Sequence, residues 1–281
     1  MRRQLFAPAA LAAAVTLGAA TSPASAAVPV WQETGTAYVD SLSGGQGLAS
    51  RADGSLLHRG LGSIPLDLRI KGWNHVGDPD IAQGYVFDAY QGPDTATSKM
   101  FAVTTPSGKR YEYVHKLDAG EKLNNSFASV SPDGQWLVSG EWGDQNRLQV
   151  FPAPLLNAAA PGTGGALPQA PQITLDKPVR DIQGCDFVND TRLLCASDDG
   201  SKELFPEDRP LLQVDLTHRL DGGPVTGRVT SLFALPQRSV CSGTFEAEGV
   251  DYDAARGTLR AEVVSPGVCQ VATTVYAYRL Q

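Results

Sequence analysis

The 281-residue sequence lacks the short motifs that mark several common enzyme classes. It contains no GxSxG, HExxH, P-loop or GxGxxG segment. These absences argue against a nucleophile elbow, a zincin metal site and the two common phosphate-binding loops. Histidine is scarce too, and three of the four lie in segments with no apparent partner: His58, His115 and His218. A Ser-His-Asp hydrolase is therefore poorly supported.

Long apolar runs are missing except near the N-terminus. Two arginines precede an apolar stretch from Leu5 to Ala20, and Ala24-Ser25-Ala26 resembles a cleavage site. This pattern predicts a secretory signal peptide over residues 1–26. The stretch is too short and too rich in Ala and Gly for a membrane span. We expect residues 27–281 to form a single secreted, extracellular and monomeric domain.

Basic charge is in deficit, with 23 Lys and Arg against 30 Asp and Glu and a net charge of -7. No basic run with interleaved aromatic residues is present. Nucleic acid and anionic membrane surfaces are therefore excluded as expected partners. A small molecule or an extracellular protein or glycan is the partner class that remains.

Cysteine occurs four times, always in the second half of the chain. An even number in an exported protein predicts two disulfides. A turn at Asn189-Asp190 would set Cys185 opposite Cys195, which favours the pairs Cys185–Cys195 and Cys241–Cys269. One bridge with two free buried thiols is the alternative. The absence of a CxxC segment or a nearby Cys/His pair argues against zinc.

Helical periodicity is nearly absent, whereas short alternating apolar runs bounded by Gly, Pro, Asp and Asn are frequent, which predicts an all-β fold. One layout recurs: a small or Gly-containing entry, a strand, a polar turn and a second apolar strand. It covers residues 46–57, 76–87, 126–137, 182–193 and 248–259. The Pro/Gly/Ala-rich stretch 152–172 predicts an exposed loop.

Two of these hairpins carry a resemblance. SVSPDGQWLVSG resembles the inner hairpin of TolB-like β-propeller blades, and EGVDYDAARGTL resembles that of secreted esterase-like and senescence-marker-like propellers. The resemblance implies a β-propeller of five blades, with room for a sixth around Phe205 to Leu235. The final strand TTVYAYRLQ would close the ring against strands near Ala37 to Asp40. A β-sandwich explains the alternation equally well but not the repeated hairpin.

In a propeller, residues at a fixed distance before each turn converge at one mouth of the central channel. Counting nine back from each turn gives Gly45, His75, Asn125, Asp181 and Glu248. Their oxygen donors suit calcium, and His75 also admits a transition metal. The turn lengths leave Glu246 and Asn124 as alternatives to Glu248 and Asn125. A hydrated structural channel explains the same polar residues.

Asp78 and Asp80 flank Pro79 next to His75. They are either metal or substrate contacts, with Asp78 joining the candidate metal ligands, or caps of an Asx-type turn. Asp251 and Asp253 lack the spacing of a calcium loop and fit a turn.

Trp142 follows Glu141, a pair found where sugars stack, although such a Trp more often covers the side of a sheet.

The expected function is that of a ligand-binding, partner-binding or scaffold protein rather than an enzyme. A calcium-dependent hydrolase of the lactonase, esterase or phytase type is the alternative that the family resemblance implies, with a metal ion polarising a carbonyl or phosphoryl oxygen. A third possibility is a paired-carboxylate glycosidase that uses Asp78, Asp181 and Glu248.

Overall fold

The computed structural model describes residues 30–124 and 126–281. The predicted signal peptide and the candidate ligand Asn125 therefore lie outside the described residues.

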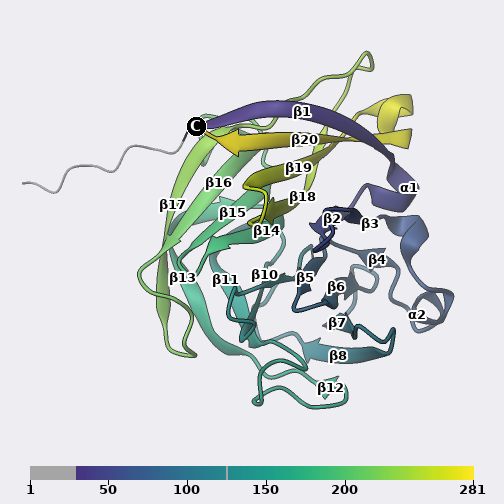
Figure 1. Ribbon diagram of the computed structural model, residues 1–281, viewed down its shortest axis with the longest axis vertical. Helices are drawn as coiled ribbons and strands as arrows, with labels where there is room; N and C mark the ends of the chain where they lie inside the picture. Colours follow the sequence, from purple (N-terminus) through teal and green to yellow (C-terminus); the bar gives the residue numbers. More distant parts are fainter. Residues whose placement is uncertain (1–29, 125) are drawn as a thin grey trace, which may run out of the picture.

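All five repeated hairpins form antiparallel strand pairs, and each pair supplies the inner strands of one blade (Figure 1). We number the blades I to V in chain order; blades III and IV belong to one continuous eight-stranded sheet. The first strands are β2 (Gly47–Ser50), β5 (Asp80–Ala82), β9 (Ser129–Val130), β14 (Ile182–Asn189) and β18 (Glu246–Asp253). The second strands are β3 (Leu56–Arg59), β6 (Tyr85–Gln91), β10 (Trp136–Ser139), β15 (Arg192–Ser197) and β19 (Thr258–Val264).

The first strands surround a central channel. Each contacts the next in the order β2, β5, β9, β14 and β18, and β18 contacts β2 again. A closed ring of this kind is the inner wall of a five-bladed β-propeller. The fold prediction is confirmed.

Outer strands complete every blade except blade I, which has two strands. Blade II adds β4 (His75–Val76), β7 (Ser98–Thr104), β8 (Arg110–Lys116) and β12 (Gly165–Ala166); blade III adds β11 (Asp144–Pro152) and β13 (Ala170–Arg180). Blade IV adds β16 (Pro210–Leu216) and β17 (Val225–Ala234); blade V adds β20 (Ala272–Leu280) and β1 (Trp31–Asp40). The region considered for a sixth blade thus supplies the outer strands of blade IV.

Helical structure is limited to short segments in the described chain: α1 (Ser41–Gly44), η1 (Leu61–Ser63), α2 (Leu66–Ile70) and η2 (Gly267–Val271). Three of them, α1, η1 and α2, flank the two strands of blade I in the chain.

The ring closes where the two ends of the described chain meet. Strand β1 pairs antiparallel with β20 along its length, from Trp31 opposite Leu280 to Asp40 opposite Ala272. The final strand therefore meets the predicted N-terminal partner. Blades III and IV are joined as well, because β13 pairs in parallel with β17 at Ile173 and Val225.

Both predicted disulfides are present. Cys185 and Cys195 occupy directly opposite positions on β14 and β15, with Cα atoms 4.0 Å apart. Cys241 and Cys269 bridge the segments before β18 and before β20. The first bridge ties the inner hairpin of blade IV, and the second ties two connections of blade V.

Apolar side chains fill the spaces between neighbouring blades. One buried cluster joins blades II and III through Phe87, Phe101 and Phe151, and another joins blades IV and V through Leu211 and Tyr276. Burial of such surface is the main driving force for folding. The alternating strand pattern therefore places its apolar face between blades.

Blade I is held to its neighbours largely by polar contacts. Arg59 donates to both carboxylate oxygens of Asp88 in blade II, at 2.6 and 3.1 Å. On the other side, His58 Nδ1 lies 3.1 Å from the fully buried carboxyl of Glu262 in blade V. These links compensate for the small apolar surface that two short strands offer.

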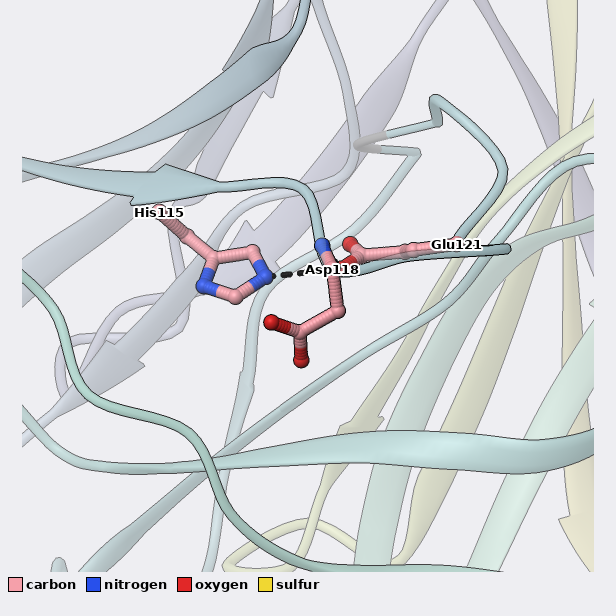
Figure 2. A group of neighbouring side chains, drawn as sticks. All are labelled: His115, Asp118 and Glu121. Atoms are coloured by element: carbon pink, nitrogen blue, oxygen red, sulfur yellow. Dashed lines mark hydrogen bonds and ion pairs between the residues drawn. The ribbon is translucent and has the colours of Figure 1, made fainter.

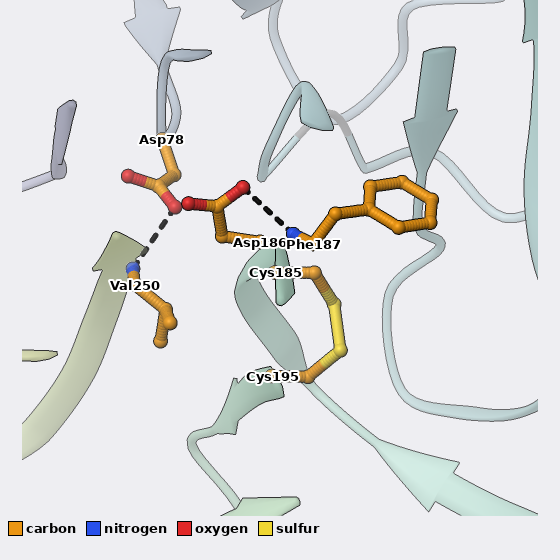
Figure 3. Close-up of a disulfide and its surroundings, with 6 residues drawn as sticks. All are labelled: Asp78, Cys185, Asp186, Phe187, Cys195 and Val250. Carbon is orange, nitrogen blue, oxygen red and sulfur yellow. Dashed lines mark hydrogen bonds between the residues drawn. A yellow bond between two sulfur atoms is a disulfide. The ribbon is translucent and has the colours of Figure 1, made fainter. Parts of the chain in front are cut away.

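The centre of the channel is occupied by the Asp78 side chain. The backbone of Asp78 pairs with Ser126 and Ala128 of the segment entering blade III. The next residue, Pro79, has no N–H to continue this pairing. Asp78 Oδ1 accepts from the N–H of Leu48 at 2.9 Å, and Oδ2 accepts from the N–H of Val250 at 3.0 Å. Figure 3 shows the carboxyl turned toward Val250. A single side chain thus bonds the inner strands of blades I and V.

Three glycines make room for this carboxyl. A Cβ atom on Gly47, Gly184 or Gly249 would lie 2.4 Å from a carboxylate oxygen of Asp78. Burial raises the pKa of Asp78 well above its ordinary range, while the two N–H donors act in the opposite direction.

A second layer of aspartates lies nearer the opposite mouth; Asp251 is buried, and Asp80 and Asp186 are partly buried. Asp80 accepts from Val130 N–H at 2.6 Å, Asp186 from Tyr252 N–H at 2.6 Å, and Asp251 from Ser50 N–H at 2.7 Å. All three carboxyls line a cavity of about 660 Å³. Each bond joins one blade to the next in the ring.

These bonds correct the reading of Asp78 and Asp80 as caps of a local turn. Asp78 is buried and Asp80 is partly buried, and both accept from backbone N–H groups of other blades. Asp251 likewise bonds Ser50 and Arg260, whereas Asp253 accepts from Arg256 within its own turn. The turn reading holds for Asp253 alone.

We expect Asp78→Ala to lower the free energy of unfolding by about 3 kcal/mol, because two buried N–H groups lose their acceptor. Urea denaturation measures this difference. Asp190→Ala, at an exposed turn, is the control and should change stability by less than about 0.5 kcal/mol. Equal stabilities of the two variants would contradict the central role of Asp78.

We expect Gly249→Ala to destabilise the fold by about 2 kcal/mol, because the new methyl group meets both Asp78 and the Cα of Gly47. Gly35→Ala on β1 is the matched control, since a Cβ there has no neighbour within 4 Å. Thermal unfolding of the pair checks the result. A Gly249→Ala protein that melts with the control would show that the channel is wider than described.

Candidate functional site

A cavity of about 640 Å³ opens at the mouth on the other side of Asp78. This volume is within the range of small-molecule sites, roughly 300–1,000 Å³. Side chains from all five blades or their connections line it: Gln46, His75, Gln91, Asp94, Lys122, Leu123, Asn124, Trp142, Gln183, Asp198, Glu246 and Glu248. The lining is polar except for Leu123 and Trp142.

Three cavity residues directly precede the glycines that surround Asp78. They are Gln46, Gln183 and Glu248. In β14 and β18 the strand register shifts at this point, so that each inner strand carries an extra residue. A β-bulge changes the direction in which a side chain points. In both strands the bulge coincides with a side chain at the mouth, and the glycine that follows this side chain faces the channel.

The structure separates the residues proposed from sequence as metal ligands. His75 and Glu248 line the cavity, as do the alternatives Asn124 and Glu246. Asp78 lies in the channel with both oxygens bonded to backbone N–H groups.

Asp181 is absent from the cavity lining, and its Oδ1 accepts from Gly143 N–H at 2.7 Å. The four candidates that lie in the described residues are thus not brought together as one ligand set.

Glu248 is the buried carboxyl of the cavity, with 7% of its surface exposed. It accepts a long hydrogen bond of 3.4 Å from Gln46 Nε2. Burial raises the pKa of Glu248 well above its ordinary range, and the nearby Glu246, Asp198 and Glu262 carboxyls add to the effect. Burial thus disfavours the charged form of this carboxyl.

Asp198 is the second carboxyl of the cavity wall, and it has firm partners. Its Oδ1 accepts from Ala247 N–H and from Arg209 Nε, both at 2.8 Å. Burial nevertheless raises the pKa of Asp198 to about 6. Burial has the opposite effect on His75, whose pKa it lowers, so the imidazole is neutral near pH 7.

Asn124 provides an unused donor. The residue is 4% exposed, and its backbone carbonyl accepts from Lys99 Nζ at 3.2 Å. Its side-chain Nδ2 is buried without a hydrogen-bond partner. Buried polar groups normally have partners. An unpaired amide in a cavity wall therefore indicates a position where a ligand acceptor would be bound.

Trp142 lies at the rim of the cavity and is 51% exposed. Its neighbour Glu141 is buried and bonds Arg147 Nε at 2.7 Å. This Trp therefore does not cover the side of a sheet, as was expected, because its half-exposed ring lies beside the polar cavity. Glu141 pairs with Arg147 instead of facing the cavity with the ring.

A separate His-carboxylate group lies at the end of β8 and in the segment that follows it (Figure 2). Ligand atoms of His115, Asp118 and Glu121 come within 4.8 Å of one another, and no other group of three His, Cys, Asp or Glu does so in the described part of the chain. His115 Nε2 lies 2.8 Å from Glu121 Oε2, and the fully buried Lys99 Nζ lies 3.2 Å from Oε1.

Burial disfavours the Glu121 anion, but the His115 hydrogen bond and the Lys99 charge together lower its pKa to about 2. Because Lys99 already supplies the positive charge, we interpret this group as a structural ion-pair network.

Two of the histidines that appeared isolated in the sequence do have carboxylate partners: His58 bonds Glu262 and His115 bonds Glu121. His218 lies 4.0 Å from Asp221 on an exposed loop. None of the three lines the mouth cavity.

Sequence reasoning missed Gln183 and selected Asp181 two residues earlier. A signal was available, because a Gln or Glu directly precedes a glycine in Gln46-Gly47, Gln183-Gly184 and Glu248-Gly249. Asp94 follows β6, Lys122 precedes β9 and Asp198 follows β15. These three residues lie outside the repeated hairpins, so the hairpin register could not select them.

No family model and no curated protein matches the sequence. Among matching solved structures is the native arabinanase Arb43A of Bacillus subtilis, with 13% identity, coverage of 88% of this chain and 92% of that chain, and a TM-score of 0.40. The assignment as a propeller rests on the ring of inner strands.

The described residues contain no helix with the length and apolar character needed to traverse a bilayer.

We expect Glu262→Gln to alter the pH dependence of stability. Burial raises the pKa of Glu262 to about 7 from an ordinary value of 4.5, so the folded chain retains a proton that the unfolded chain loses. The wild-type free energy of unfolding should therefore fall, relative to the variant, by about 3 kcal/mol as pH rises from about 4.5 to above 7.

Urea titrations at several pH values measure this difference. The exposed variant Asp190→Asn should follow the wild-type curve. Parallel curves for wild type and Glu262→Gln would contradict the raised pKa.

Proposed function

We propose that this protein is a secreted propeller that binds an oligosaccharide in the mouth cavity. The observation that carries the proposal is the half-exposed Trp142 ring at the edge of a cavity whose remaining wall is polar. Sugar rings combine apolar C–H faces with many hydroxyl groups. They therefore need an aromatic surface on one side and amide or carboxyl groups on the other.

The polar wall suits hydroxyl groups. Gln46, Asn124 and Gln183 offer amides, each with both donor and acceptor atoms, and Glu248 offers a carboxyl. The unpaired Nδ2 of Asn124 supports a bound acceptor at that position. Each of the five blades, or a connection next to it, contributes a residue to this wall. The arrangement of the blades therefore sets the shape of the cavity.

Two further features agree with an extracellular role. The chain carries two disulfides, and such bonds persist in oxidising compartments. The N-terminal sequence has the pattern of a secretory signal. A monomeric, exported binding protein is the form of the function that we propose.

The test is a glycan array followed by calorimetry with three β-1,4-linked tetrasaccharides, built from glucose, N-acetylglucosamine and glucosamine. Binding of at least one saccharide supports the proposal. An array and a tetrasaccharide series without any binding would overturn it. Release of shorter oligosaccharides during the incubation would add hydrolysis to binding.

We expect Trp142→Ala to weaken saccharide binding by about tenfold, because the stacking surface is removed. Calorimetry with the tetrasaccharide that binds the wild type best measures the loss. The control is Tyr38→Ala, which removes a 76% exposed aromatic ring from β1, and its affinity should equal that of the wild type. Equal affinities for both variants would place the binding site elsewhere.

A further inference from the structure

The mouth cavity has an excess of negative charge. Asp94, Asp198, Glu246 and Glu248 line it, against Lys122. Asp198 is balanced by Arg209, which lies 2.8 Å away. Lys122 Nζ donates to the backbone oxygen of Asp144 at 2.6 Å, at the Trp142 side of the rim.

Glu248 is left without a positively charged partner. No Lys, Arg or His within residues 30–124 and 126–281 forms an ion pair with it, and it accepts a hydrogen bond of 3.4 Å from Gln46. A buried carboxyl costs much free energy as an anion unless a cation accompanies it. Its location in the wall of an open cavity means that a ligand can supply that cation.

The other cavity groups fit a cationic ligand as well. The face of a half-exposed Trp attracts ammonium groups through its quadrupole. Asn124, 4% exposed and with Nδ2 unpaired, provides an independent sign of a ligand position in the same wall. Neutral His75 adds no positive charge that would repel an ammonium group.

Resting on the saccharide-binding function proposed above, we propose that the ligand is an amino sugar whose protonated amine pairs with Glu248. The ligand's ammonium group supplies the positive charge, and Glu248 releases its proton to solvent as the ammonium–carboxylate pair forms. The groups that face Glu248 are Glu246 on β18, Glu262 on β19, Asp198 after β15 and Gln46 before β2. None of them is a cation.

The three tetrasaccharides test this inference, since they share a linkage and differ at the C2 substituent. Glucosamine tetrasaccharide should bind the wild type about tenfold more tightly than the glucose or N-acetylglucosamine forms at about 0.15 M salt. In Glu248→Gln, this preference should fall to within about threefold, while binding of the glucose form is retained through the amide.

Asp190→Asn removes the same unit of charge from an exposed turn and is the matched control. It should keep the tenfold preference, which excludes general attraction between a cationic sugar and an acidic protein. If Glu248→Gln does not fold, Glu246→Gln at the same mouth provides the second variant and should reduce the preference by about threefold.

The outcomes separate the two proposals. Equal affinities of the wild type for the three tetrasaccharides overturn the amino-sugar inference and leave saccharide binding intact. A preference that persists in Glu248→Gln and Glu246→Gln, or that falls equally in Asp190→Asn, also overturns it. If no saccharide binds, both proposals fail.

Discussion

The hydrogen bonds of the Asp78 carboxyl are the interaction on which the channel depends. Its two oxygens bind Leu48 of blade I and Val250 of blade V, and its own backbone pairs with the segment entering blade III. One residue of blade II therefore contacts three other blades. Because the carboxyl is fully buried, loss of these acceptors would leave N–H groups with no water to replace them.

The weakness of blade I explains why such polar bonds are needed. Two short strands cannot bury the apolar area that four strands bury, and apolar area drives the association of blades. Arg59 with Asp88 and His58 with Glu262 join this blade to its neighbours instead. These pairs are partly buried, and they connect blade I to blade II on one side and to blade V on the other.

The same arrangement defines the candidate site. Asp78 and its three glycines occupy the middle of the channel, so that Gln46, Gln183 and Glu248, one residue earlier, stand at the mouth. The mouth then contains a buried carboxyl without a cation, an amide without a partner and a half-exposed Trp. Groups that a folded chain leaves unsatisfied in a cavity are the usual signs of ligand recognition, and they underlie both proposals.

The five hairpins, both disulfides and the pairing of the last strand with the first could be predicted from the sequence. Turn residues and strand alternation specify a hairpin locally, and Cys185 lies opposite Cys195 on one such hairpin, which leaves Cys241–Cys269 as the second pair. The composition of the site could not be predicted in this way. A bulge in β14 places Gln183 rather than Asp181 at the mouth. Asp78, which directly precedes Pro79, places its side chain in the channel. Such shifts of one or two residues depend on contacts between blades, which local sequence patterns do not encode.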